Sequence, residues 1–178
     1  MRRRVTGKQP NSRMCFVCGL ENDGGLQASF HELENGELMA VFTPGENLQS
    51  YPGRLHGGIV SAILDETIGR AVMMGRAESY WGVTIEITVR FRKPVPLDRE
   101  LRVIGRITRD GKRVFEGSGE VLLPDGSVAA EGFGRYMKLP LEKIADFKPE
   151  EQNWRVTPLP DDPRFIELGP EDGDRDGG

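Results

Sequence analysis

The sequence predicts an α+β fold in which one long helix lies across one face of a curled antiparallel sheet. Three observations support this class. Two strand-like segments come first, an apolar run of helical length follows them, and several further strand-like segments complete the regular part of the chain. Because the apolar faces of a lone helix and of a one-sided sheet each need a partner, packing one on the other satisfies both.

The first two strands are expected at residues 26–33 and 37–43, on either side of an Asn-Gly pair that is a strong hairpin signal. Residues 44–55 contain two prolines and two glycines and are expected to form a loop. The helix then begins at His56 and ends near Gly75. At the α-helical rise, a run of about 18 residues is roughly 27 Å long, which predicts a central position in the domain.

Residues 83–92 alternate strictly between apolar and polar side chains, which predicts a strand with one buried and one solvent-exposed face. The strand pattern recurs at residues 101–109, 114–123 and 128–137, with an Asp-Gly turn signal in each gap between these three segments. Strands joined by short turns predict an antiparallel sheet.

A single domain is expected at residues 14–139, because a chain of 178 residues with 37% hydrophobic composition can build one core. Residues 1–13 are rich in arginine and lysine and predict a disordered basic tail. Residues 140–178 predict a Pro-rich extension with one or two helical turns at 141–147 and a flexible acidic end. Three apolar side chains could attach this extension to its own domain or to a partner subunit: Trp154, Phe165 and Ile166.

The composition excludes several classes of function. A net charge of -4 and a pI near 5.4 argue against a nucleic-acid-binding protein, which needs a concentrated basic surface. No run approaches the roughly 20 apolar residues that span a bilayer, and no secretory signal follows the N-terminal arginines. We therefore expect a cytoplasmic protein that binds neither nucleic acid nor membrane.

The two cysteines, Cys15 and Cys18, form a single C-x2-C pair, which is half of a tetrahedral zinc site. His31 offers a third ligand, but the sequence shows no fourth, and closed structural zinc sites have four. The sequence therefore predicts no metal and no cofactor, with a pair of reduced thiols buried in a turn.

The segment at residues 56–66 carries the clearest functional signal, because a glycine pair opens an apolar helix that contains a carboxylate. Free N–H groups at a helix N-terminus carry partial positive charge and can hold an oxyanion. A carboxylate on an otherwise apolar helix is costly unless it has a use. This combination predicts a reaction site.

Helix geometry distinguishes the two acidic residues of this segment. Glu66 is followed four residues later by Arg70, in the orientation that favours an ion pair. Asp65 shares its face with small residues that leave space for a substrate, namely Gly58, Ser61, Ala62 and Gly69. Asp65 is therefore the predicted functional acid, and the alternative is a solvent-facing acid on an amphipathic helix.

An ordered set of motifs covers about residues 14–138. It comprises Cys15 to Gly19 before Gly25-Leu26, Tyr51-Pro52-Gly53, Leu55 to Gly58, Leu64-Asp65-Glu66, Val83-Thr84, Phe91 to Val95 and Asp125-Gly126. This set resembles the hotdog-fold acyl-CoA thioesterases, and within them the phenylacetate-pathway-like branch. No single motif is decisive, but their order is specific.

The resemblance implies a curved sheet wrapped around one long helix and hydrolysis of an acyl-CoA thioester to free acid and coenzyme A. It implies dimers or tetramers, with the site between subunits and no metal. The family's roles fall on Gly57, whose amide would polarise the thioester carbonyl, and on Asp65, which would act as nucleophile or as base for water.

Helix geometry adds a constraint to these two roles. Gly57 and Asp65 are eight residues apart, so their backbones lie roughly 12 Å from each other along the helix axis. A carbonyl bound to the Gly57 amide must therefore meet the Asp65 of a second copy, which a twofold axis would supply. We expect a homodimer or a dimer of dimers.

Further residues complete the predicted site. His56 is counted with Asp65 and Gly57 as catalytic, although a capping histidine is the alternative. Contacts to the thioester or to water are expected from four residues, Gly58, Gln49, Ser50 and Thr84. Cationic contacts to the phosphates of coenzyme A are expected from Arg90, Arg92 and Lys93, for which solvated strand charges are the alternative.

Two other functions fit the same fold. A non-catalytic acyl-CoA sensor would use the same cleft for binding alone. A hydratase would need an aspartate and a histidine acting next to the carbonyl, and the chain offers only His31 and His56.

Overall fold

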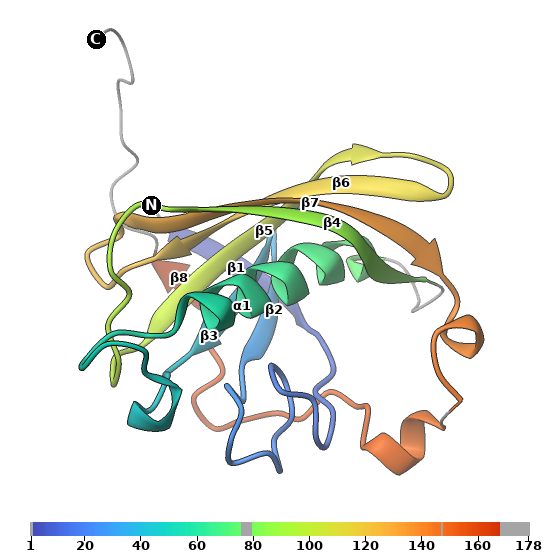
Figure 1. The fold of residues 1–178 in the computed structure, drawn as a ribbon. Coiled ribbons are helices and arrows are strands. Elements are labelled where there is room, and N and C mark those ends of the chain that lie inside the picture. The colour runs from blue at the N-terminus through green and yellow to red at the C-terminus, as the bar shows by residue number, and fades with distance from the viewer. Residues whose placement is uncertain (1, 76–79, 147, 168–178) are drawn as a thin grey trace, which may run out of the picture.

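The computed structural model describes residues 2–75, 80–146 and 148–167. Within these ranges one long helix, α1 (Gly57–Arg70), lies against one face of an eight-stranded sheet that curls around it (Figure 1). The strand order is β4-β7-β6-β5-β3-β2-β1-β8, and the paired strands run antiparallel. The predicted fold class is confirmed.

Six of the eight strands correspond to segments that the sequence patterns predict, and β1 and β8 are additional. The strands are β1 (Arg2–Lys8), β2 (Ser29–Leu33), β3 (Leu38–Phe42), β4 (Trp81–Phe91), β5 (Leu101–Asp110), β6 (Val114–Leu122), β7 (Val128–Leu139) and β8 (Phe165–Glu167). Short 3₁₀ turns lie at Glu46–Leu48, Ala71–Met73, Leu141–Lys143 and Pro149–Gln152. None of the helices in the described ranges has the length and hydropathy needed to cross a membrane.

Helix α1 ends earlier than the apolar run predicts. Its regular part stops at Arg70, and residues 71–73 tighten into a 3₁₀ turn with Val72 and Met73 buried. The run is apolar to its end because this turn is also packed in the core, and burial alone does not distinguish an α-helix from a 3₁₀ turn.

The predicted disordered tail at residues 1–13 is wrong, because residues 2–8 form strand β1. This strand pairs with β2 on one side and with β8 on the other. The amine of Lys8 also forms an ion pair with Asp162 at 2.6 Å. The partners of β1 lie up to 165 residues away, so the local basic composition gives no sign of them.

The Pro-rich extension attaches to the chain's own domain. Ile166 is buried with Leu33, Met39 and Ile104, and Trp154 packs against the core beneath α1. The ordered unit therefore extends beyond residues 14–139. The predicted helical turn is seen at Leu141–Lys143, whereas the acidic end at 171–178 lies outside the described residues.

Close packing of α1 on the sheet depends on glycines in β6 and β7. A Cβ atom at Gly117 would lie 2.5 Å from Cγ2 of Ile68 and 2.8 Å from the carbonyl oxygen of Arg106. Gly119 and Gly132 face the same helix side chain, with Ile68 carbons 3.1 and 3.2 Å from their Cβ positions. The missing side chains bring the middle of α1 close to the sheet, where Asp65 lies.

The Gly117→Ala substitution is expected to lower the free energy of unfolding by about 1–3 kcal/mol, because the added methyl group must displace Ile68 or the backbone of β5. Urea denaturation measures the change. Gly24→Ala is the matched control, since its Cβ would meet only the Asn22 side chain, at 3.4 Å. Equal stability of the two variants would contradict the close approach described above.

Candidate active site

The entrance of α1 presents one unengaged backbone donor. His56 occupies the N-cap position in an extended conformation, and its Nδ1 accepts a hydrogen bond from the Gly58 N–H at 2.9 Å. The capping alternative for His56 is therefore the observed arrangement. Within the described ranges no acceptor is recorded for the N–H of Gly57, which is left at the positive end of the helix dipole.

The carboxylate of Asp65 lies between α1 and the sheet. The hydroxyl of Thr84 lies 2.9 Å from Oδ1 and 3.1 Å from Oδ2 of Asp65, and the hydroxyl of Tyr136 donates to Oδ1 at 3.1 Å. Thr84 belongs to β4 and Tyr136 to β7, where the two residues are direct partners in the ladder. One register between two strands thus positions both donors.

A β-bulge in β4 turns Thr84 toward the helix. The register with β7 shifts between Thr84 and Glu86, so Ile85 is an extra residue and is 48% exposed. The predicted strict alternation is therefore wrong at Ile85, which it places on the buried face. Thr84 is exposed, as predicted, and its hydroxyl reaches Asp65. Thr84 thus donates to Asp65, and it also lines the hollow beside that carboxylate.

The sequence pattern does not identify Tyr136 as a site residue. Its strand has the pattern of a core strand, and a buried aromatic residue there carries no sign of a polar role. The hydroxyl meets Asp65, which lies 71 positions earlier in the chain. The phenol group could have indicated a polar contact at this position, because a buried tyrosine hydroxyl usually has a hydrogen-bond partner.

Burial is the main influence on the pKa of Asp65, and it raises that pKa above its ordinary value. The hydrogen bonds from Thr84 and Tyr136 act in the opposite direction but do not outweigh burial. The pKa of Tyr136 is also raised, first by burial and then by the Asp65 charge, so its hydroxyl remains a donor. Asp65 is thus a more basic carboxylate than an exposed aspartate.

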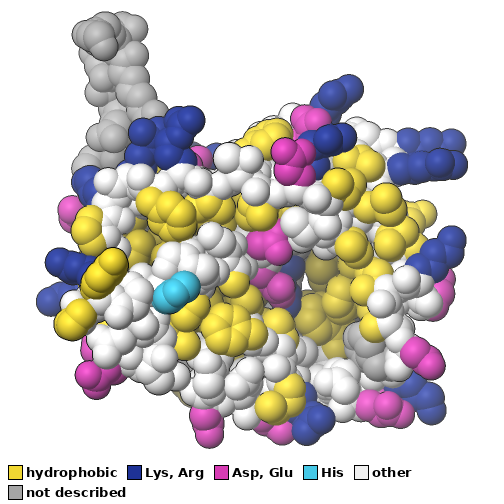
Figure 2. All heavy atoms as spheres, in the orientation of Figure 1, with side chains coloured by type: hydrophobic (Ala, Val, Ile, Leu, Met, Phe, Trp, Pro, Cys, Tyr) yellow, Lys and Arg dark blue, Asp and Glu magenta, His cyan; other side chains and the backbone are white. Residues whose placement is uncertain are grey.

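The neighbouring acid, Glu66, has the ion pair that its spacing predicts. The Nε atom of Arg70 donates to Oε1 of Glu66 at 2.7 Å. A hollow of about 130 Å³ lies beside both acids, and its lining includes Gly69 and three larger apolar side chains, Met73, Trp81 and Trp154. Figure 2 shows acidic side chains in a hollow of this face, among hydrophobic ones.

A second hollow, of about 400 Å³, lies at the entrance of α1. Its walls include Gly57, Ser50, Phe91, Arg92 and Lys93. No residue lines both hollows, so the unengaged amide and the carboxylate open into different places on one chain.

The remaining predicted contacts are engaged elsewhere or lie apart. The Oε1 atom of Gln49 accepts the Gly53 N–H at 3.3 Å, which holds the loop before α1. The Gly58 N–H is bound to His56, and Arg92 forms an ion pair with Glu131 at 2.9 Å. Arg90 is exposed and lines neither hollow.

Comparison with known proteins identifies the domain. The family model described as "Thioesterase superfamily" matches residues 52–130, the part that holds α1, β4, β5 and β6. This match covers a little under half of the chain and makes that region similar to the thioesterase superfamily. The domain has the hotdog fold, as the motif set predicts.

One curated relative is the mouse acyl-coenzyme A thioesterase THEM4, which is 26% identical over 139 residues, 76% of this chain and 58% of the relative. The chain spans about half the length of the curated relatives it matches first.

Solved structures share this fold. A thioesterase superfamily protein is 26% identical, with a TM-score of 0.62 over 68% of this chain and 58% of its own. The E. coli PaaI protein of phenylacetic acid degradation is 16% identical, with a TM-score of 0.57 over 64% and 80%. A Streptococcus mutans protein bound to acetyl CoA is 19% identical, with a TM-score of 0.53 over 59% and 82%.

The raised pKa of Asp65 predicts an effect on stability. Folding raises the pKa of Asp65, so the folded state favours the protonated carboxyl over the charged one. The stability that the protonated carboxyl contributes is lost as the pH rises through the pKa of the folded state. Asp65→Asn should therefore raise the free energy of unfolding at pH 7, and the gain should vanish below about pH 4, near the ordinary pKa of aspartate.

Urea denaturation at pH 7 and at low pH tests this expectation. Asp125→Asn is a suitable control, because hydrogen bonds from Ser127 lower the pKa of Asp125 and its substitution should give no gain. A loss of stability in Asp65→Asn at pH 7 would mean that burial does not dominate the environment of Asp65.

Proposed function

We propose that the protein hydrolyses an acyl-CoA thioester to a free acid and coenzyme A, with Asp65 as the general base. The single observation that carries the proposal is the half-buried carboxylate of Asp65 on helix α1, which accepts hydrogen bonds from two hydroxyl groups of the sheet, within the region that matches the thioesterase superfamily. The mouse relative, an acyl-coenzyme A thioesterase, and the acetyl CoA bound to a protein of the same fold support the substrate class.

The hydrogen bonds on Asp65 favour a base over a nucleophile. Oδ1 accepts from Tyr136 and lies nearest to Thr84, which fixes the carboxylate and leaves Oδ2 with the freer lone pairs. In the proposed step Oδ2 takes a proton from water while the water oxygen bonds to the thioester carbon. The C–S bond then breaks, and Asp65 returns the proton to the departing coenzyme A sulfur.

The Gly57 N–H supplies the complementary charge. It has no recorded acceptor in the described ranges and lies at the positive end of the helix dipole, where it can donate to the carbonyl oxygen as negative charge develops. Arg92 and Lys93 line the same hollow and carry the charge needed for the phosphates of coenzyme A.

The site is proposed to form between two copies of the chain. Gly57 and Asp65 open into separate hollows and lie roughly 12 Å apart along one helix, so one chain cannot bring both to one carbonyl. A twofold axis would bring the Gly57 of each copy to the Asp65 of the other, which gives two equivalent sites in each dimer.

Two substitutions test the two roles. Asp65→Asn is expected to lower kcat about 10²- to 10⁴-fold through loss of the base. Gly57→Pro is expected to lower it about 10²- to 10³-fold, because proline removes the N–H that would bind the oxyanion. Proline is tolerated at the first helical position, and His56 already has the extended conformation that a following proline requires.

Release of free thiol from a panel of acyl-CoA and aryl-acyl-CoA substrates measures these effects. Gly57→Ala is the matched control, because it keeps the N–H and its Cβ would make only an ordinary contact with Phe91, at 3.5 Å. An unmodified protein that binds acyl-CoA but releases no thiol would be a sensor, and the proposal would fail.

Mixing the two inactive variants tests the shared site. When Asp65→Asn and Gly57→Pro chains are unfolded together and refolded, about half of the dimers contain one of each, and each of these has one intact site. About a quarter of the normal activity should return. Activity no higher than that of either variant alone would show that each site lies within one chain.

A further inference from the structure

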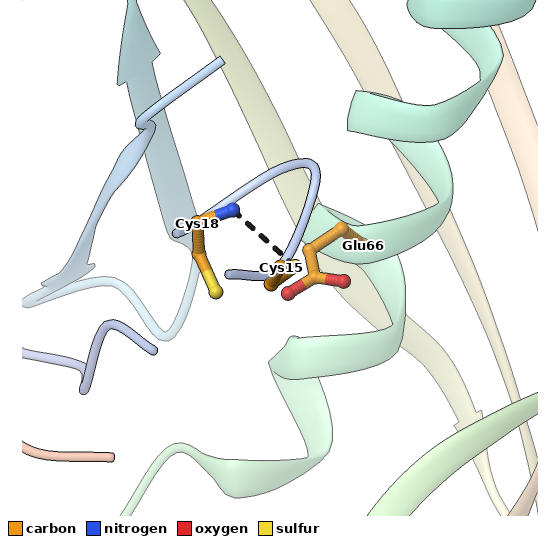
Figure 3. A group of neighbouring side chains, drawn as sticks. All are labelled: Cys15, Cys18 and Glu66. Carbon is orange, nitrogen blue, oxygen red and sulfur yellow. Dashed lines mark hydrogen bonds between the residues drawn. The ribbon is translucent and has the colours of Figure 1, made fainter. Parts of the chain in front are cut away.

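Three metal-ligating side chains meet on the side of α1 that faces the N-terminal loop. They are Cys15 and Cys18 of that loop and Glu66 of the helix, and their ligand atoms all lie within 4.8 Å of one another. Figure 3 shows the Glu66 carboxylate turned toward the two cysteines. Cys18 is 1% exposed, and the other two residues are half-buried. The proposed hydrolysis does not use this cluster.

The cysteine turn places polar hydrogen-bonding groups beside both sulfur atoms. The backbone N–H groups of Val17 and Cys18 donate to Sγ of Cys15 at 3.3 and 3.4 Å, and the Ser12 hydroxyl lies 3.4 Å from Sγ of Cys18. Donors to sulfur favour its deprotonated form, which is the form that binds a metal. A Cβ atom at Gly19 would lie 2.4 Å from the Cys15 carbonyl oxygen, so the tight turn needs glycine.

Glu66 has one carboxylate oxygen available. Its Oε1 accepts from Arg70, whereas no donor to Oε2 is recorded in the part of the chain that the structure describes. Arg70 is itself fixed, since Nη1 donates to the Pro10 carbonyl at 2.9 Å and the guanidinium lies 4.2 Å from the ring centroid of Phe30. A partner that orients a ligating carboxylate in this way is typical of the surroundings of metal sites.

The charges around the cluster balance when a divalent cation is added. Two thiolates and one carboxylate carry three negative charges, and Arg70 supplies one positive charge. A divalent cation brings the sum to zero, which matters because unbalanced charge is costly in a buried place.

We propose that Cys15, Cys18 and Glu66 bind one thiophilic divalent cation of the Zn²⁺ class, with water as the fourth ligand. Thiolate sulfur and carboxylate oxygen are both ordinary zinc ligands, and the C-x2-C spacing is a common one. The cation ties the N-terminal loop to α1 one residue away from Asp65. The sequence predicts no metal, because Glu66 joins the cysteines only when the chain folds.

Cobalt provides the direct test, because Co²⁺ commonly substitutes for Zn²⁺ and reports its ligands through absorption. The reduced, metal-free full chain should bind one Co²⁺ with a sulfur-to-cobalt charge-transfer band and the visible bands of a tetrahedral site. Zn²⁺ should abolish these bands by displacement and should raise the melting temperature. Binding should weaken as the pH falls, because the thiols must lose their protons.

Variants identify the ligands. Cys15→Ser and Cys18→Ser should each remove the charge-transfer band or reduce it strongly, and Glu66→Gln should weaken Co²⁺ binding about tenfold or more, as the loss of even outer-shell groups does. The amide oxygen introduced by Glu66→Gln would still offer Arg70 an acceptor. Glu46→Gln, at an exposed position, and Asp65→Asn, next to the site, are the controls and should bind Co²⁺ normally.

The proposal is overturned if the reduced chain shows no charge-transfer band, or if Glu66→Gln binds as tightly as the unmodified chain. It is also overturned if the reduced chain binds no Co²⁺ but closes a Cys15–Cys18 disulfide on mild oxidation, since the cysteines would then be a redox pair. Because Co²⁺ binding is read without substrate, its failure is distinct from a failure of the proposed hydrolysis.

Discussion

The arrangement of this site depends on one half-buried carboxylate, that of Asp65, held between a helix and two paired strands. Burial makes the negative charge costly, and hydroxyl groups from Thr84 and Tyr136 offset part of that cost. Both hydroxyls come from a single pair in the β4–β7 ladder. The β-bulge after Thr84 is therefore as important as the donors, because without it this side chain would face away from the helix.

Helix α1 contributes acidic side chains to two chemically different neighbourhoods, because successive side chains on a helix point in different directions. Asp65 faces the sheet and meets hydroxyl groups. Glu66 faces the N-terminal loop and meets a guanidinium and two thiols. The close approach that the glycines of β6 and β7 allow holds both neighbourhoods in place.

Segments outside the matched region 52–130 complete the surroundings of α1. The indole of Trp154, from the Pro-rich extension, packs in a tilted arrangement against Trp81, with the ring centroids 4.5 Å apart, and also lies against the guanidinium of Arg70. Strands β1 and β8 pair the two ends of the described chain at the edge of the sheet. The ends are thus part of the fold, and Arg70 links the N-terminal loop, the helix and the extension.

Local patterns were sufficient for the fold class, six of the strands, the position of α1 and the ion pair between Glu66 and Arg70. Alternation, turn residues and helical spacing are properties of neighbouring residues, so the sequence alone determines them. Tertiary structure decided the direction of Thr84, the role of Tyr136, the strands at the two ends and the meeting of Glu66 with the cysteines. Each of these depends on contacts between residues far apart in the chain, and no local pattern records which distant group fills a given place.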